Sequence, residues 1–184
     1  MLTFDRFLRE NTRERAAINL LFEERLFGLV EILHKAAGMF AAEDIPYELV
    51  GGMAVAAWIE QVDRDQIMLT RDVDIMIRRS DLDRVLEGQE RKAINGIRLI
   101  FAGEAVRPDQ APNPVLAPEQ VTVHGMKVSV ISVADLVRMK LNSYRDKDRV
   151  HVRGIDAAGL ITPEVERALP EQLRARLQTI RETE

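Results

Sequence analysis

The chain has 184 residues, of which 46% are hydrophobic and 30% charged, with no cysteine and a formal net charge of −4. This length fits one ordinary domain, and the apolar fraction excludes a wholly disordered chain. Without cysteine, the chain has no disulfide framework, thiolate zinc site or cysteine nucleophile. The three histidines, His34, His124 and His151, are scattered along the sequence. Carboxylates must therefore supply most ligands of any bound metal.

The distribution of charge narrows the classes of partner. The mildly acidic balance argues against a protein that coats nucleic acid by charge alone. No uncharged run approaches the roughly 20 residues of a membrane-spanning helix. Charged side chains also interrupt residues 1–14, so no signal peptide is expected there. We therefore expect a cytoplasmic protein without a membrane partner.

Residues 11–42 carry apolar side chains at three- and four-residue steps, the period of an amphipathic helix. Leu26, Leu29 and Leu33 lie on its apolar face. Such a helix either covers the sheet of its own domain or presents this face to a small protein partner or a second copy of the chain. We assign residues 1–45 to an N-terminal helical extension that packs on the core.

Strand and helix patterns alternate through residues 46–160, which we assign to one α/β (α+β) domain. Short β-type runs bounded by turn residues occur at 47–50, 72–77, 96–101 and, as a hairpin, 121–131. Helical patterns occur at 53–60, at 80–86 with Ser80 as the expected cap, and at 132–144 with Ser132 as the expected cap. The proline-rich residues 104–120 are expected to form an irregular loop. Residues 161–184 form a C-terminal helical segment.

The run from Leu49 to Gly52 leads from a strand into a helix through two glycines. Glycine has no Cβ, so the backbone can approach a ligand closely, and the exposed amides at a helix start favour phosphate. A tight strand-to-helix turn would need the same two residues. The pair Gly51–Gly52 is therefore a candidate phosphate site that the sequence alone does not distinguish from a turn.

Asp72 and Asp74 stand at alternate positions of a predicted strand. Alternate side chains share one face, about 6.6 Å apart along the backbone, and leave Val73, Ile75 and Ile77 to be buried on the other. Aspartate is disfavoured in strands, so the pair indicates a site for a hard cation, which in turn grips a triphosphate. The alternative is two acids on a solvated strand face.

The order of these features resembles the nucleotidyltransferases of the DNA polymerase β superfamily. A glycine pair after the first strand, a short helix and an Asp-x-Asp pair on the second strand are typical of that superfamily. Residues 135–141 and 145–148 are similar to the Asp-Leu-x-x-x-Lys-Leu helix and the Lys-Asp element of small bacterial nucleotidyltransferases related to type IV toxin enzymes. The resemblance covers about residues 46–160.

The resemblance implies a mixed sheet flanked by helices, and transfer of a nucleoside monophosphate from a nucleoside triphosphate to a hydroxyl of RNA, protein or a small molecule. It implies two Mg²⁺ or Mn²⁺ ions on Asp72 and Asp74. The residues expected to bind the nucleotide are Gly51, Gly52, Met53, Arg71, Lys140 and Lys147. Lys140 is equally consistent with a lysine whose stem covers apolar helix surface and whose ammonium reaches solvent.

The third carboxylate of the superfamily usually comes from a later strand, and the corresponding strand here carries Arg98. Glu104, just past that strand, is the candidate third catalytic residue beside Asp72 and Asp74. Two functions follow: a metal-dependent nucleotidyltransferase, or a catalytically degenerate nucleotidyltransferase fold that binds a partner in a toxin–antitoxin or phage-defence pair. A third possibility, nucleic-acid binding by the basic residues of 145–153, competes with a solvated helix face because acids interleave them.

Overall fold

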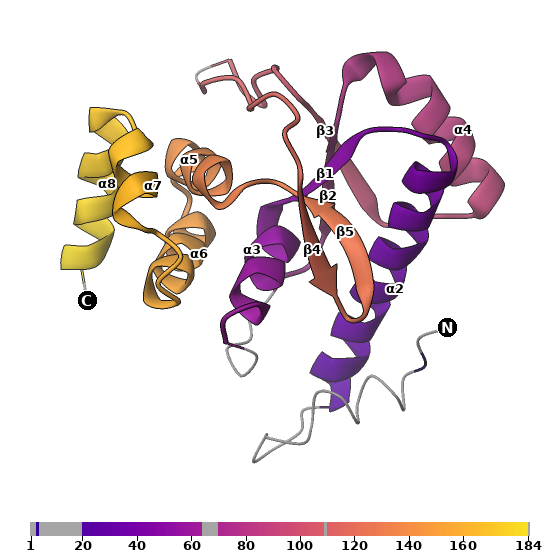
Figure 1. The fold of residues 1–184 in the computed structure, drawn as a ribbon, viewed down its shortest axis with the longest axis horizontal. Helices are drawn as coiled ribbons and strands as arrows, with labels where there is room; N and C mark the ends of the chain where they lie inside the picture. Colours follow the sequence, from indigo (N-terminus) through magenta and orange to yellow (C-terminus); the bar gives the residue numbers. More distant parts are fainter. Residues whose placement is uncertain (1–2, 4–19, 64–69, 109, 184) are drawn as a thin grey trace.

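The computed structural model describes residues 3, 20–63, 70–108 and 110–183 (Figure 1). The long N-terminal helix is therefore tested only from α2 (Leu20–Ala42) onward, and residues 11–19 of the prediction lie outside the described residues. Gly28 and Gly38 both lie within α2 and do not end it. The helix ends at Ala42, as its apolar period predicts.

Five strands form one mixed sheet in the order β3-β2-β1-β5-β4. They are β1 (Tyr47–Val50), β2 (Val73–Ile77), β3 (Ile97–Phe101), β4 (Glu119–Val123) and β5 (Met126–Val130). β1 is antiparallel to β2 and parallel to β5, β2 is parallel to β3, and β4 is antiparallel to β5. The predicted α/β class, a mixed sheet flanked by helices, is confirmed.

Helices cover the sheet in layers (Figure 1). On one side α2 contacts β2, β5 and α4 (Leu82–Lys92), and on the other α3 (Gly51–Glu60) contacts β1, β2 and β4. The C-terminal helices are α5 (Val133–Ser143), α6 (Asp146–Ala157), α7 (Pro163–Ala168) and α8 (Glu171–Glu182). They pack on one another, and α5 and α6 also contact α3. In the described part of the chain, no helix combines the length and the apolar character that crossing a membrane requires.

The described part of α2 belongs to the core of the protein. Leu29, Leu33 and Phe40 are buried, and the Phe40 ring stacks on Tyr47 of β1 with ring centroids 4.5 Å apart. This part of α2 therefore covers the protein's own sheet, which is one of the two roles predicted for it. Leu29 and Leu33 are consequently not available to a partner, whereas Leu26 is only partly buried.

Local capping signals explain one helix start and fail at another. Ser132 Oγ accepts a hydrogen bond of 3.2 Å from the Asp135 amide at the start of α5, as predicted. The cap expected at Ser80 is wrong, because a 3₁₀ turn (Arg79–Asp81) occupies that position and α4 begins only at Leu82. α4 also continues six residues past the predicted end, to Lys92.

Leu33→Ala should lower the free energy of unfolding by about 2–5 kcal/mol, because the truncated side chain leaves a cavity in a core that does not fully collapse. Leu33 is fully buried between α2 and the sheet. Lys35→Ala, an exposed position on the same helix, is the matched control and should change stability by less than about 0.5 kcal/mol. Urea denaturation measures both, and equal effects would contradict the packing of α2 described above.

Candidate functional site

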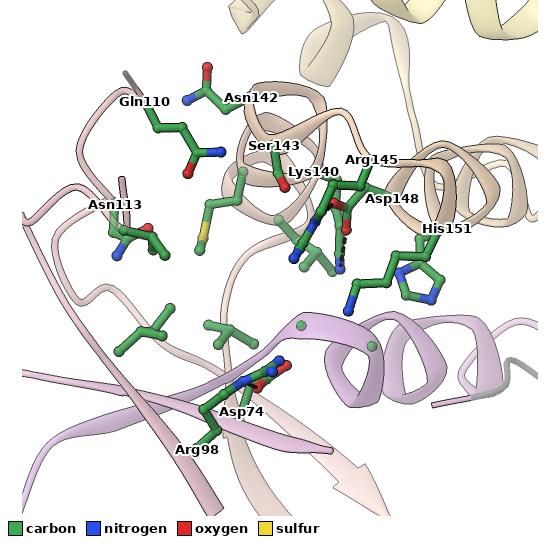
Figure 2. A pocket seen from close by; sticks show the side chains of 18 of the residues that line it. Asp74, Arg98, Gln110, Asn113, Lys140, Asn142, Ser143, Arg145, Asp148 and His151 are labelled. Atoms are coloured by element: carbon green, nitrogen blue, oxygen red, sulfur yellow. Dashed lines mark hydrogen bonds and ion pairs between the residues drawn. The ribbon is translucent and has the colours of Figure 1, made fainter. Parts of the chain in front are cut away.

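A pocket of about 690 Å³ opens where the sheet meets α5, α6 and the proline-rich loop between β3 and β4 (Figure 2). Because β1 is antiparallel to β2, and β2 is parallel to β3, the end of β1 and the starts of β2 and β3 meet at one edge of the sheet. These three strand ends contribute Val50, Asp74 and Arg98 to the pocket lining. Sheet topology therefore brings the glycine pair and the aspartate pair into one site.

The Gly51–Gly52 turn lets the backbone lie directly against flanking side chains. Gly51 has a φ of +69°, and a Cβ there would lie 2.0 Å from Asp74 Oδ2. A Cβ on Gly52 would lie 2.5 Å from Thr70 Oγ1. Real Cβ atoms do not approach other atoms so closely, so the glycines serve more than a tight turn. Gly51 in particular makes room for a carboxylate of the pocket.

Arg98 contacts both predicted metal-binding aspartates. Asp74 of β2 and Arg98 of β3 are cross-strand partners, and Arg98 Nε donates a hydrogen bond of 2.6 Å to Asp74 Oδ1. Arg98 Nη1 lies 3.5 Å from Asp72 Oδ2. The Asp74 side chain is 11% exposed and that of Asp72, which precedes β2, is 48% exposed. The two carboxylates thus share one pocket and one guanidinium, and the hydrogen bond to Asp74 is the chief reason that the pKa of Arg98 is raised.

The two carboxylates limit the number of metal ions that this pocket can bind. Magnesium is commonly held by one or two protein carboxylates together with oxygens of substrate phosphates. Asp72 and Asp74 meet that requirement for one ion that a nucleotide carries. The described residues contain no group of three or more His, Cys, Asp or Glu suited to a metal, and a guanidinium stands beside Asp74. The residues therefore fit one cation delivered with phosphate, and they do not fit the two ions that the resemblance implies.

Glu104 does not reach this pocket. Its carboxylate accepts a hydrogen bond of 2.6 Å from Arg79 Nε, and both residues follow the ends of the parallel strands β3 and β2. Asp74 lies near the start of β2, so Glu104 and the aspartate pair are at opposite ends of these strands. The expectation that Glu104 supplies the third catalytic carboxylate is therefore corrected, since neither its place in the sheet nor its arginine partner allows it.

An ion cluster around the buried Asp148 forms the helical wall of the pocket (Figure 2). Lys140 Nζ of α5 lies 3.0 Å from Asp148 Oδ1 of α6, and Arg145 Nε lies 2.7 Å from Asp148 Oδ2. Burial alone would raise the pKa of Asp148, but a hydrogen bond from Arg145, the charge of Lys140 and a hydrogen bond from Ser143 outweigh it and lower the pKa to about 2. Burial lowers the pKa of Lys140, and the charges of Asp148 and Asp74 oppose that shift. The Lys140 ammonium is thus paired inside the protein and does not reach out to solvent.

The remaining predicted residues differ in position. Arg71 and Lys147 line the pocket, are exposed, and have no ion-pair partner among the described residues. The Met53 side chain is buried in the core and does not line the pocket, so only its backbone at the start of α3 remains available to a ligand. His151 also lines the pocket and is absent from the predicted set, although its spacing of three residues from Asp148 on a helix is a usable signal.

The far end of the pocket is rich in amide side chains and comes largely from a loop that carries no sequence signal for a site. Gln110 and Asn113 of this loop face Asn142 of α5 across the hollow (Figure 2). Asn113 Nδ2 donates a hydrogen bond of 2.9 Å to the Phe101 carbonyl, which anchors the loop to β3. The pocket therefore has a charged end at the aspartate pair and an amide-rich end beneath the loop.

Comparisons with known proteins identify the fold. No family model and no curated protein sequence matches the chain. A solution structure of the antibiotic-resistance factor ANT(2'')-Ia is similar, with a TM-score of 0.57 and 16% identity over 83% of this chain and 92% of that chain. A crystal structure of ANT(2'')-Ia with adenylyl-2''-tobramycin gives a TM-score of 0.56 and 15% identity over 82% and 97%. The chain therefore has the fold of these nucleotidyltransferases, while the likeness to type IV toxin enzymes stays a prediction.

Gly51→Ala should lower the free energy of unfolding in two ways. A strained positive φ costs about 1–3 kcal/mol, and the contact of the added Cβ with the Asp74 carboxylate should add to that loss. Gly125→Ala is the matched control, since Gly125 has a φ of +82° and a Cβ added there would have no atom within 4 Å. Urea denaturation compares the two variants. Equal losses would show that the contact between Gly51 and Asp74 contributes nothing.

Asp148→Asn should reduce the dependence of stability on pH. A carboxyl whose pKa is about 2 in the folded protein stabilises the fold above its unfolded pKa, and this contribution is lost as pH falls through 2. Between pH 5 and pH 2 the free energy of unfolding of the native protein should therefore fall by about 2 kcal/mol more than that of the variant. This is the value expected when folding lowers the pKa of one carboxyl by nearly two units. Urea denaturation across this range measures the difference, and parallel pH profiles would contradict it.

Proposed function

We propose that this protein binds a nucleoside triphosphate with one divalent cation in the pocket and transfers its nucleoside monophosphate to a hydroxyl acceptor. The observation that carries the proposal is the meeting of the Gly51–Gly52 turn with Asp72 and Asp74 at one sheet edge. The fold shared with ANT(2'')-Ia supports it. A magnesium or manganese ion on the aspartate pair would neutralise phosphate charge and lower the pKa of the attacking hydroxyl.

The charges of the pocket favour a polyphosphate. Its cationic lining residues are Arg71, Arg98, Arg107, Arg138, Lys140, Arg145 and Lys147. Its acidic ones are Asp72, Asp74 and Asp148, and each of these already has a cationic partner. A strongly positive pocket in a chain of net charge −4 concentrates anions locally. This charge pattern supports phosphate binding more directly than the fold does.

The two ends of the pocket suit the two ends of a nucleotide. The start of α3 at Gly51–Gly52 offers backbone amides for phosphate oxygens, and the cations Arg71 and Lys147 border the same pocket. Gln110 and Asn142 at the other end each carry both a donor and an acceptor, which matches the polar edge of a nucleobase. We therefore assign phosphates to the charged end and the base to the amide-rich end.

The charge pattern also bears on the acceptor. The ANT(2'')-Ia complex contains adenylyl-2''-tobramycin, and aminoglycosides are polyamines that require anionic side chains. Every acidic side chain that lines the present pocket is paired with arginine or lysine. We infer a neutral or anionic hydroxyl acceptor, whether RNA, protein or a small molecule, in place of a polyamine.

A second candidate is a nucleotide-binding module without transferase activity, used in a toxin–antitoxin or phage-defence pair. The observation that favours it is Arg98, which occupies the position beside Asp74 where a further carboxylate would complete a metal site. Both candidates require nucleotide binding. They differ in whether label from the nucleotide is transferred to another molecule.

Incubation with each α-labelled nucleoside triphosphate, Mg²⁺ or Mn²⁺, and separated RNA, protein and small-molecule fractions should label one fraction. Asp72→Asn with Asp74→Asn should abolish the labelling, because the cation loses both protein ligands. A nucleotide at about 100 times its Kd should also stabilise the native protein by about 2.7 kcal/mol in thermal unfolding.

Asp83→Asn, which removes an exposed carboxylate of α4 away from the pocket, is the control and should leave both readouts unchanged. Stabilisation by a nucleotide without any labelled product would favour the binding module. The absence of stabilisation by every nucleotide and metal would contradict both candidates.

A further inference from the structure

We propose that Arg98 is a resident cation that excludes divalent metal ions from Asp72 and Asp74 while no nucleotide is bound. This exclusion deepens the proposed function and rests on it for one step, the relief of the exclusion by phosphate. If Arg98 excludes the metal ion, nucleotide and metal ion must enter the pocket together. The fold alone does not determine this order of binding.

One oxygen of Asp74 is bound to Arg98, and the other faces the backbone of Gly51. Oδ1 accepts the 2.6 Å hydrogen bond from Arg98 Nε. Oδ2 lies against the backbone of Gly51, so close that a Cβ there would be 2.0 Å away. The side chain is only 11% exposed. A metal ion that binds Asp74 at Oδ1 must therefore displace the guanidinium.

The charge of Arg98 also opposes a metal ion at this place. A single guanidinium lies within 3.5 Å of one carboxylate and 2.6 Å of the other, so a divalent ion between them would stand within ion-pair distance of a positive charge. The Lys140 ammonium adds to the positive field at Asp74. Repulsion at such separations weakens the binding of a divalent ion to the two carboxylates.

Arg98 is nevertheless able to change partners. It lies on the edge strand β3, its side chain is 54% exposed, and its ion pairs among the described residues are those with Asp72 and Asp74. Arginine binds phosphate in the same forked geometry as carboxylate. By contrast, Lys140 is itself buried and is held by the buried Asp148. A triphosphate would therefore draw Arg98 away and bring its own metal ion to the carboxylates.

The test is a titration with Mn²⁺ in the absence of nucleotide. The electron paramagnetic resonance signal of the free ion measures how much Mn²⁺ is bound. Arg98→Gln should bind Mn²⁺ at least about tenfold more tightly than the native protein, because a unit charge is removed at ion-pair distance. Arg98→Lys retains the charge and should stay close to the native protein. Arg98→Gln combined with Asp74→Asn should lose the gain, which assigns the new binding to the aspartate pair.

Equal Mn²⁺ affinity of the native protein and Arg98→Gln would overturn the inference, as would a folded Arg98→Gln that binds no Mn²⁺. Circular dichroism checks the fold, and Arg98→Ser replaces the glutamine variant if that variant does not fold. The measurement contains no nucleotide, so it is independent of the labelling experiment. A tenfold gain in a protein that no nucleotide stabilises would support the exclusion by Arg98 and contradict the proposed function.

Discussion

The position of the Asp74 carboxylate is the constraint on which the site depends. It is nearly buried at the meeting point of three strand ends, where an unpaired carboxylate would be strongly unfavourable. Gly51 makes room for one of its oxygens, and Arg98 from the neighbouring strand neutralises the other. A side chain on Gly51 or a neutral residue in place of Arg98 would disturb the same few atoms. The turn at Gly51 and the pairing of β2 with the edge strand β3 therefore both accommodate the Asp74 carboxylate.

The pairing of each acid explains how an acidic protein acquires a positive pocket. Asp148 stays ionised although it is buried, because Lys140 and Arg145 surround it. The same cluster joins α5 to α6, so the charge arrangement also stabilises the helical wall. Cations without such partners among the described residues, Arg71 and Lys147 included, are left facing the pocket. A net charge taken over the whole chain hides this separation.

The sequence predicts features that depend on neighbouring residues and misses those that depend on topology. The strand before Gly51 and the Ser132 cap follow from local patterns, and both are present as predicted. Glu104 is a candidate for the site in the sequence because it follows a strand close to Arg98. Since β2 and β3 are parallel, the end of β3 lies away from Asp74, and only the strand order shows this. No local pattern indicates that the proline-rich loop lines the pocket.

A shared fold at 16% identity describes how the sheet and helices are arranged, while the chemistry depends on the few side chains at the strand ends. Here a single residue, Arg98, supports two different conclusions about the function. It is the cross-strand partner of Asp74 and places a positive charge, not a further carboxylate, beside the aspartate pair. It is also the exposed cation whose partners are the very ligands that a nucleotide-borne metal would need. Under the proposed function, a nucleotide-borne metal ion would reach both carboxylates once phosphate displaces this guanidinium from Asp74.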